Sequence, residues 1–440
     1  MMPGFSSAFK FEKPDLISSL VVFIIAMPLS LGIALASGAS PAAGLITGVV
    51  GGIVAGLFAG APLSVTGPAA GMTALVFQLI HQYGLKGLAI ITVFAGLIQI
   101  GFSLVRAGGL FTLIPKAVLE GVLTAIGAII VVGQLHVLMG SGIPKSTLTG
   151  VVTLPTVAMA VAWPILLCGL LALAIQMIWK SKMQKYKWIP GALPAVVAIT
   201  FLSLIWEMPR VALEPLLPLV QASGLEFLKF EWLEGASMFL LPALGVAVVA
   251  SAESLLTARA VDTLVRDREG FRPAQLNKEL FAQGAANMIS GVLGGLPMTA
   301  VMVRSAANVD SGARTRWSTM LHGVWIAAFV GFLPDIIEHV PLTALAAVLI
   351  MTGYKLLNVP TLIHELKTHP REGFLWIATA LLVLGTDLLT GLIAALVLAS
   401  LMNFKAILKA ISQRRSPAHA DTLETVADMT EKEINKTAVN

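Results

Sequence analysis

One sequence pattern occurs twice in the chain, as Gly56-Leu-Phe-Ala-Gly-Ala-Pro-Leu-Ser64 and as Gly291-Val-Leu-Gly-Gly-Leu-Pro-Met-Thr299. Both copies follow the form G-x-x-x-G-x-P-x-[S/T]. A second echo pairs Ile114-Pro115 with Val340-Pro341, in the same order along the chain. Glycine is abundant, so either match alone carries little weight. Together, at similar offsets, they indicate two homologous halves.

The composition is that of a membrane protein. Of 440 residues, 57% are hydrophobic and 12% are charged, against roughly 25% charged in a soluble domain. So few polar residues cannot cover soluble domains, which excludes a soluble enzyme, a nucleic-acid-binding module and a disordered protein. Unbroken apolar runs such as 90–104 exclude an outer-membrane β-barrel, whose strands alternate polar and apolar residues. We therefore predict an all-α polytopic membrane protein.

Hydrophobic runs between polar, glycine or proline breaks predict about fourteen transmembrane segments. They begin near residues 15, 42, 65, 86, 115, 153, 190, 236, 279, 300, 317, 341, 372 and 389. Each half then holds about seven helices, and an odd number means that the second half enters the membrane upside down. The third and tenth segments are too short for a full span. Short helices at matching positions of inverted repeats point to a transporter's binding site.

Lysine and arginine gather on alternate loops, as the positive-inside rule demands. The lysines of 180–187 fall on one side and the acidic stretch 207–234 on the other. If the amino terminus is in the cytoplasm, most lysines and arginines fall on cytoplasmic loops. The exceptions are Arg304, which lies within the membrane, and four residues on the outer side: Lys86, Lys145, Arg210 and Lys229. We predict an inner-membrane protein with both termini in the cytoplasm.

The domain organisation follows from the same pattern. We expect a cytoplasmic segment over residues 1–13, a transmembrane domain over 14–405 and a short cytoplasmic tail over 406–440. The first repeat covers about 14–207 and the second about 236–405. The tail is too short for an independent core.

The two short helices form the candidate anion site. Backbone at mid-membrane depth must line a cavity, because lipid cannot satisfy its polar groups. Two helix amino termini there offer unpaired N–H groups and positive dipole ends, which bind an anion. The candidate residues are Thr66, Gly67, Pro68, Ala69, Ala70, Met302, Val303, Arg304 and Ser305. The alternative is that these small residues serve helix packing.

Arg304 strengthens the case for an anion site. It is the basic residue deepest in an apolar region, where an arginine costs at least ~2.5–3.5 kcal/mol. A bound anion would offset that cost and leave Arg304 to supply a positive field. A fixed salt bridge with Glu253 or Asp387 is the alternative.

Glu253 and Thr257 form the candidate cation site. They are four residues apart and so share one helical face. A carboxylate and a hydroxyl can ligate Na⁺, and a buried glutamate alone can carry a proton. The alternative is a residue at the cytoplasmic helix end that merely reaches water. Glu120 and Asp387 are further intramembrane carboxylates with either a structural or a functional role.

An enzyme is not expected. His364-Glu365 and His369 look like a zinc-protease motif, but the histidines are five residues apart and so lie on different helix faces. We also find no P-loop and no Ser/His/Asp set. We expect no cofactor beyond Na⁺ as a coupling ion.

Three motifs resemble the SulP inorganic-anion permeases. They are Pro28 with Ser37-Gly-Ala-Ser-Pro41, Ser64-Val-Thr-Gly67-Pro68, and Gly294-Gly-Leu-Pro297 through Arg304-Ser-Ala-Ala-Asn308 with Gly312-Ala-Arg-Thr315. The resemblance covers about residues 14–405. It implies a fold of two inverted repeats divided into a core (helices 1–4 and 8–11) and a gate (helices 5–7 and 12–14). It also implies an anion bound between helices three and ten.

Two departures from the family refine this expectation. The chain stops too soon for the cytoplasmic STAS domain that most members carry, and Pro28-Leu29 stands where many sulfate-type members have Pro-Gln. The combination is similar to a short branch linked with carbonic anhydrases and thought to carry bicarbonate. Bicarbonate-carrying relatives bind sodium through an acidic residue and a threonine that match Glu253 and Thr257. They usually have aspartate there, whereas proton-coupled members favour glutamate.

The sequence thus predicts a symporter of a small inorganic oxyanion, with bicarbonate favoured over sulfate, driven by Na⁺ and an elevator-like movement. The alternatives are a proton-coupled sulfate or dicarboxylate transporter and an uncoupled anion exchanger or channel. A nucleobase permease would hold its base with an acidic residue in the tenth helix, where this chain has Arg304. Partners are expected to be the anion, the lipid bilayer and a second copy in a homodimer, with a functional link to a carbonic anhydrase and no nucleic acid. The apolar side chains at the site predict weak affinity and modest selectivity.

Overall fold

A computed structural model describes residues 11–402, apart from 145–146, 183–188, 207, 215–219, 221–236, 269–270 and 387–389. The first half contains α1 (Lys13–Ala36), α2 (Pro41–Val50), η2 (Gly51–Ala55), α3 (Gly56–Phe58), β1 (Thr66–Pro68), η3 (Ala70–Met72), α4 (Thr73–Leu104), η4 (Ala107–Leu113), α5 (Lys116–Leu138), α6 (Thr147–Met159), α7 (Trp163–Lys182) and α8 (Ala192–Leu202). The second half contains α10 (Ser237–Val265), α11 (Leu276–Val292), β2 (Met298–Ala300), α12 (Met302–Asp310), α13 (Trp317–Phe332), α14 (Pro334–Glu338), α15 (Leu342–Leu357), α16 (Val359–Thr368), α17 (Pro370–Gly385) and a last helix over Thr390–Met402.

The two halves repeat the same order of elements. In each half two helices lead into a short strand, and a half-helix follows it: α4 as far as Gly84 after β1, and α12 after β2. The second sequence echo falls at equivalent places too, because Pro115 is the N-cap residue of α5 and Pro341 that of α15.

Six described helices are long and apolar enough to cross a membrane, and a bent pair of α6 and α7 raises the number to seven. The predicted sixth segment, near residue 153, is in fact this pair, in which the chain bends by 117° between the two helices. Pro164 lies in the first turn of α7, where its missing N–H costs nothing, so a new helix starts there. The predicted fourth segment, near residue 86, continues α4 beyond a break at Gly84, whose φ of 71° suits glycine.

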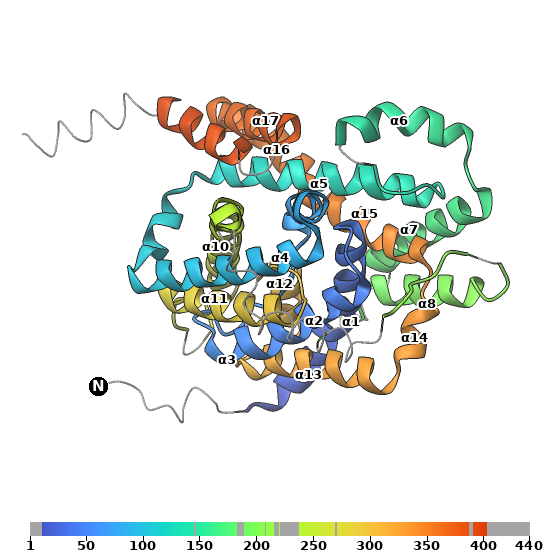
Figure 1. Cartoon of the computed structure of the whole chain (residues 1–440), viewed down its shortest axis with the longest axis horizontal. Helices are drawn as coiled ribbons and strands as arrows, with labels where there is room; N and C mark the ends of the chain where they lie inside the picture. The colour runs from blue at the N-terminus through green and yellow to red at the C-terminus, as the bar shows by residue number, and fades with distance from the viewer. Residues whose placement is uncertain are drawn as a thin grey trace, which may run out of the picture.

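The helices form two packed groups. In the core, α4 packs on α10 and α11, and α1 packs on α2, α12 and α13. In the gate, α5 packs on α15 and α17, and α7 packs on α8 and α15. Figure 1 shows α5 lying across the molecule, with α16 and α17 on one side and α4 and α10 on the other. This division matches the predicted core and gate.

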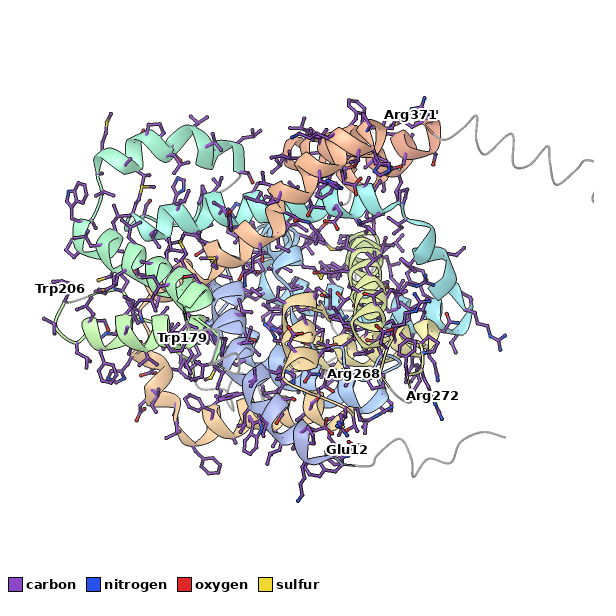
Figure 2. The ribbon with its side chains drawn as sticks, turned by 180° about the vertical axis from the view of Figure 1, so that it is seen from behind. Glu12, Trp179, Trp206, Arg268, Arg272 and Arg371 are labelled. Carbon is purple, nitrogen blue, oxygen red and sulfur yellow. The ribbon has the colours of Figure 1, made fainter. Side chains whose placement is uncertain are left out.

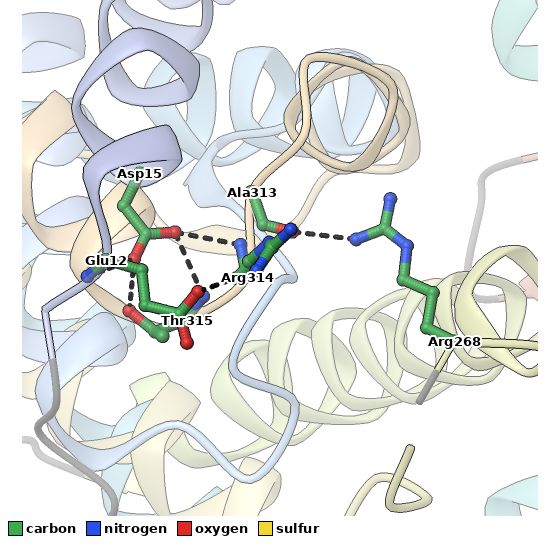
Figure 3. A network of polar contacts seen from close by, with 6 residues as sticks. All are labelled: Glu12, Asp15, Arg268, Ala313, Arg314 and Thr315. Carbon is green, nitrogen blue, oxygen red and sulfur yellow. Dashed lines mark hydrogen bonds and ion pairs between the residues drawn. The ribbon is translucent and has the colours of Figure 1, made fainter. Parts of the chain in front are cut away.

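A polar network ties together the ends of several core helices (Figure 3). The carboxylate of Asp15 accepts hydrogen bonds from the backbone N–H groups of Arg314 (2.8 Å) and Thr315 (3.0 Å) and from the Thr315 hydroxyl (2.6 Å). Arg314 also forms an ion pair with Glu12 at 3.1 Å. Arg268, which follows α10, donates to the carbonyls of Val309 and Ala313 at the end of α12. The start of α1 is thereby fixed to the α12–α13 loop.

Arg268, Arg272 and Arg371 come from loops predicted to be cytoplasmic. Figure 2 shows these three residues on one side of the view, with Trp179 and Trp206 on the other. The cytoplasmic placement itself stays a prediction. The predicted tail 406–440 lies outside the described residues, as does Asp387.

Candidate functional site

Two short strands form the centre of the candidate site. β1 and β2 pair antiparallel, with Thr66 opposite Ala300 and Pro68 opposite Met298. The N–H of Val301 donates to the Val65 carbonyl (2.8 Å) and extends the pairing. Because the strands are antiparallel, the two half-helices begin at the strand pair and leave it in opposite directions. Both helix amino termini therefore point back toward the crossing.

The first turn of α12 has unpaired backbone donors. The first bond within this helix runs from the Ser305 N–H to the Val301 carbonyl (3.0 Å), so the N–H groups of Met302, Val303 and Arg304 precede it. Met302 is 37% exposed, and Val303 is half-buried. The Ser305 hydroxyl instead accepts from the Val65 N–H (2.9 Å) and donates to Val301, so this side chain locks the helix onto β1.

Arg304 lies behind the first strand. Its side chain is fully buried, and Nη2 donates to the Ser30 hydroxyl (3.3 Å) and the Pro68 carbonyl (3.4 Å). Its Nε and Nη1 have no hydrogen-bond partner in the described part of the chain. A Cβ on Gly67 would collide with Nη1. No ion pair involves Arg304 among the described residues, so a salt bridge with Glu253 is not formed.

Glu253 lies next to Gly71, a residue of the short turn that follows β1. It is half-buried on α10, and the Thr299 side chain of β2 hydrogen-bonds to it. A Cβ on Gly71 would lie 2.8 and 2.9 Å from its two carboxylate oxygens. Thr257 follows one turn later and is buried. Glu253 therefore contacts elements of both repeats.

The remaining candidates of the first repeat are buried within or after the strand. They are Thr66, Gly67, Pro68, Ala69 and Ala70. The hydroxyl of Thr66 points to α11 rather than to an opening, and it accepts from Nε2 of Gln283 (2.8 Å). The contribution of these residues to a ligand is thus confined to their backbone.

Three buried polar residues on α11 escaped the sequence analysis. Glu279, Gln283 and Asn287 are spaced by four residues and so share one helix face. Glu279 accepts from the backbone N–H groups of Gly60 and Ala61 (both 2.9 Å) and from Gln283 (2.7 Å). A polar residue every fourth position of an apolar segment is the pattern that could have revealed this face.

Asn287 continues this polar face to the second strand. Its amide donates to the Met298 carbonyl (3.1 Å) and accepts from the Met298 N–H (2.8 Å). It also donates to Gln99 of α4 (2.8 Å), which in turn donates to Ser251 of α10 (3.2 Å). One face of α11 therefore anchors both β1 and β2.

The other candidates do not join this site. Glu120 hydrogen-bonds to Asn358 at the junction of α15 and α16, far along the gate. His364 is on α16, whereas His369 is the cap residue between α16 and α17 and contacts the carboxylate of Glu365 at 3.1 Å. The described residues contain no group of three or more His, Cys, Asp or Glu that could hold a metal ion.

A membrane protein with two related halves and half-helices that begin at one crossing belongs to the class of secondary transporters. Residues 13–379 match the model of the Sulfate permease family, and the chain belongs to that family. Its matched relatives are transporters rather than enzymes.

Two relatives span different parts of the chain. A putative sulfate transporter, YvdB of Bacillus subtilis (strain 168), is 28% identical over 425 residues, which cover 93% of this chain and 77% of YvdB. The bicarbonate transporter BicA of Picosynechococcus sp. is 27% identical over 256 residues, which cover 58% of this chain and 43% of BicA.

Solved structures confirm the predicted inverted-repeat fold. The transmembrane domain of a cyanobacterial bicarbonate transporter BicA superposes with a TM-score of 0.74 at 27% identity, over 87% of this chain and 97% of that one. Murine Slc26a9, an anion transporter, superposes with a TM-score of 0.72 at 15% identity, over 90% of this chain and 70% of that one. The second likeness concerns the fold alone. The chain is thus a multi-span anion transporter of this family.

Proposed function

We propose that this protein is a secondary active symporter that carries a small inorganic oxyanion, with bicarbonate favoured, together with Na⁺. One observation carries the proposal. The guanidinium of Arg304 is at Gly67, and the carboxylate of Glu253 is at Gly71, so opposite charges flank the segment that joins β1 to its half-helix.

The anion would bind at the half-helix termini. A buried guanidinium without a counter-ion is unfavourable, and Arg304 has two unpartnered nitrogens. A bound oxyanion at the N–H groups of Met302 and Val303 would compensate this charge through its field. Arg304 would act on the anion across the strand rather than by direct contact.

The cation would bind at Glu253. Its half-buried carboxylate contacts the Thr299 side chain, and Thr257 lies one turn away on the same helix face. Oxygen ligands of this kind suit a hard cation. Bicarbonate moved with one proton is equivalent to CO₂ and cannot concentrate carbon, so Na⁺ is the more useful coupling ion for bicarbonate.

Transport would follow an elevator-like movement of the core (α1–α4 and α10–α13) against the gate (α5–α8 and α15–α17). Both candidate sites are built from core elements alone, so they can move as one body. We further propose that the protein is an inner-membrane homodimer with cytoplasmic termini. A carbonic anhydrase, which interconverts CO₂ and bicarbonate, would supply the transported bicarbonate or consume it.

Uptake by reconstituted protein tests this function. Labelled bicarbonate uptake into proteoliposomes at alkaline pH is expected to saturate and to rise with an inward Na⁺ gradient. The Glu253→Gln variant should lose the Na⁺ dependence, whereas the control Glu372→Gln, at an exposed position on α17 of the gate, should keep it. Equal bicarbonate uptake with and without the gradient would contradict symport with Na⁺.

Sulfate with protons is the second candidate. It is favoured by the likeness to YvdB, a putative sulfate transporter, across 93% of this chain. Labelled sulfate uptake driven by an inward proton gradient, with no response to bicarbonate, would establish it. Glu253 would then carry the proton.

A further inference from the structure

The end of α12 is held by Arg268, which lies in the segment after α10. Its Nη1 donates to the Ala313 carbonyl (2.7 Å), as Figure 3 shows, and its Nη2 donates to the Val309 carbonyl (2.8 Å). A cation at this end of a helix can bond the last carbonyls and offsets the negative end of the helix dipole. The backbone of Arg268 is itself bonded to the end of α10, because its N–H donates to the Val265 carbonyl (3.0 Å). Arg268 therefore fastens the end of α12 to the end of α10.

The start of the same half-helix is tied to α10 as well. The Ala300 N–H of β2 donates to the Ser254 hydroxyl of α10 (3.1 Å), and the neighbouring Thr299 side chain hydrogen-bonds to Glu253. At the far end, two valines of α10 pack with Val309 in a small buried cluster. The second strand and its half-helix are thus held along α10 at both ends.

These two ties link the candidate cation site to the candidate anion site. Glu253 and Thr257 lie on α10, and the unpaired N–H groups that would hold the anion lie in the first turn of α12. A nine-residue helix is about 13 Å long, so Arg268 is too far from that turn to contact an anion there. A helix this short moves as one piece, and a shift at its end also moves its first turn. Arg268 can therefore act on the anion only by fixing the direction of α12 relative to α10.

We propose that Arg268 is a positioning residue, which fixes α12 along α10 so that a cation at Glu253 also orders the anion-binding turn. The proposal rests on the proposed symport function and adds to it the residue that couples the two sites. Coupling between two sites is reciprocal, so Na⁺ would raise the apparent affinity for bicarbonate through this tie, and bicarbonate would raise that for Na⁺. When Arg268 is replaced, the tie at Ser254 remains, but the far end of the half-helix can move away from α10.

The effect of Na⁺ on KM tests this role. The measured quantity is the ratio of KM for bicarbonate uptake without Na⁺ to KM with saturating Na⁺. We expect Arg268→Gln to lower this ratio about fivefold, at the low end of typical couplings between two sites. Arg268→Lys keeps the charge but not the planar fork that reaches two carbonyls, so it should lower the ratio about twofold. The matched control is Arg272→Gln, at an exposed position of the same loop, which should keep the wild-type ratio.

The outcomes separate this role from the transport function itself. An arginine that only stabilised the fold would change the amount of folded protein and Vmax, but not this ratio. An unchanged ratio in Arg268→Gln, or an equal fall in Arg272→Gln, would overturn the coupling role and leave the symporter intact. If Arg268→Gln does not fold, the ratio in Arg268→Lys decides in the same way.

A wild type whose uptake shows no response to Na⁺ would instead contradict the proposed symport. Amide hydrogen exchange over residues 305–312 then decides the positioning role, because it needs no transport. Faster exchange in Arg268→Gln than in Arg272→Gln would support the tie between α10 and α12. Equal exchange in the two variants would overturn it.

Discussion

Gly67 and Arg304 are in direct contact across the paired strands. A Cβ at position 67 would lie well inside the van der Waals distance of Nη1 of Arg304. The absence of a side chain in β1 is therefore what lets the guanidinium lie flat against the strand. Position 67 of the first repeat and position 304 of the second are thus structurally interdependent.

Replacing Gly67 by alanine should reduce anion uptake at least tenfold. The added methyl group displaces the guanidinium from the strand and shifts the positive field away from the half-helix termini. Initial-rate uptake in proteoliposomes measures the effect. Gly101→Ala on α4 is the control, because no atom lies within 4 Å of its added Cβ. Full activity of Gly67→Ala would contradict the role of this contact.

Removing the charge of Arg304 should abolish uptake and leave a folded protein. The variant Arg304→Met keeps much of the apolar stem but removes the field at α12. Monodisperse elution in detergent shows folding, and labelled anion uptake shows function. A fully active Arg304→Met or Arg304→Ala protein would refute the electrostatic role.

The polar face of α11 should contribute strongly to stability. In Gln283→Leu, the Thr66 hydroxyl and one Glu279 oxygen lose their shared donor. Leaving such buried groups unpaired costs about 1–3 kcal/mol, so thermal unfolding in detergent should occur at a lower temperature. Ile289→Leu, at a 40% exposed position of the same helix, should unfold like the wild type. Equal melting temperatures for Gln283→Leu and wild type would disprove the anchoring role.

Asp15 should hold the start of α1 against the α12–α13 loop. Asp15→Ala removes the acceptor of four hydrogen bonds, three of which come from the backbone N–H groups of Glu12, Arg314 and Thr315. We expect a loss of about 1–3 kcal/mol in unfolding free energy and faster amide exchange at Arg314 and Thr315. Asp335→Ala on α14 serves as a control, because the hydrogen bond between Asp335 and His339 uses the Asp335 backbone carbonyl, which the substitution keeps. Unchanged amide exchange at Arg314 and Thr315 would show that Asp15 does not hold α1 against this loop.

Much of the fold could be predicted from the sequence because its repeated pattern marks the half-helices directly. Hydrophobic runs give helix positions, and the two G-x-x-x-G-x-P copies fall where α3 and α11 lead into β1 and β2. The pairing of those strands was not predicted, because three-residue strands show no alternation of polar and apolar residues. The bend between α6 and α7 was missed because both helices are apolar and the break is short.

The candidate site was predicted only as a set of positions. Arg304 and Glu253 were identified because charges in apolar segments are conspicuous. The relative position of these two side chains was not predicted, since it depends on how β1 crosses β2. A salt bridge between them was a reasonable alternative, but Arg304 lies at Gly67 and Glu253 at Gly71, and they form no ion pair in the described part of the chain. Gln283 and Asn287 were missed because amides in a helix have no charge to attract attention, and Glu279 was missed because it lies in the first turn of α11, where a charge at the start of a segment is common.

The central claim is that one protein couples the anion to Na⁺, and ²²Na⁺ flux tests it most directly. Proteoliposomes with equal Na⁺ on both sides receive an inward bicarbonate gradient at alkaline pH. We predict uphill accumulation of ²²Na⁺ by the wild type and none by Glu253→Gln or Arg304→Met. Bicarbonate entry without any ²²Na⁺ accumulation by the wild type would contradict the account.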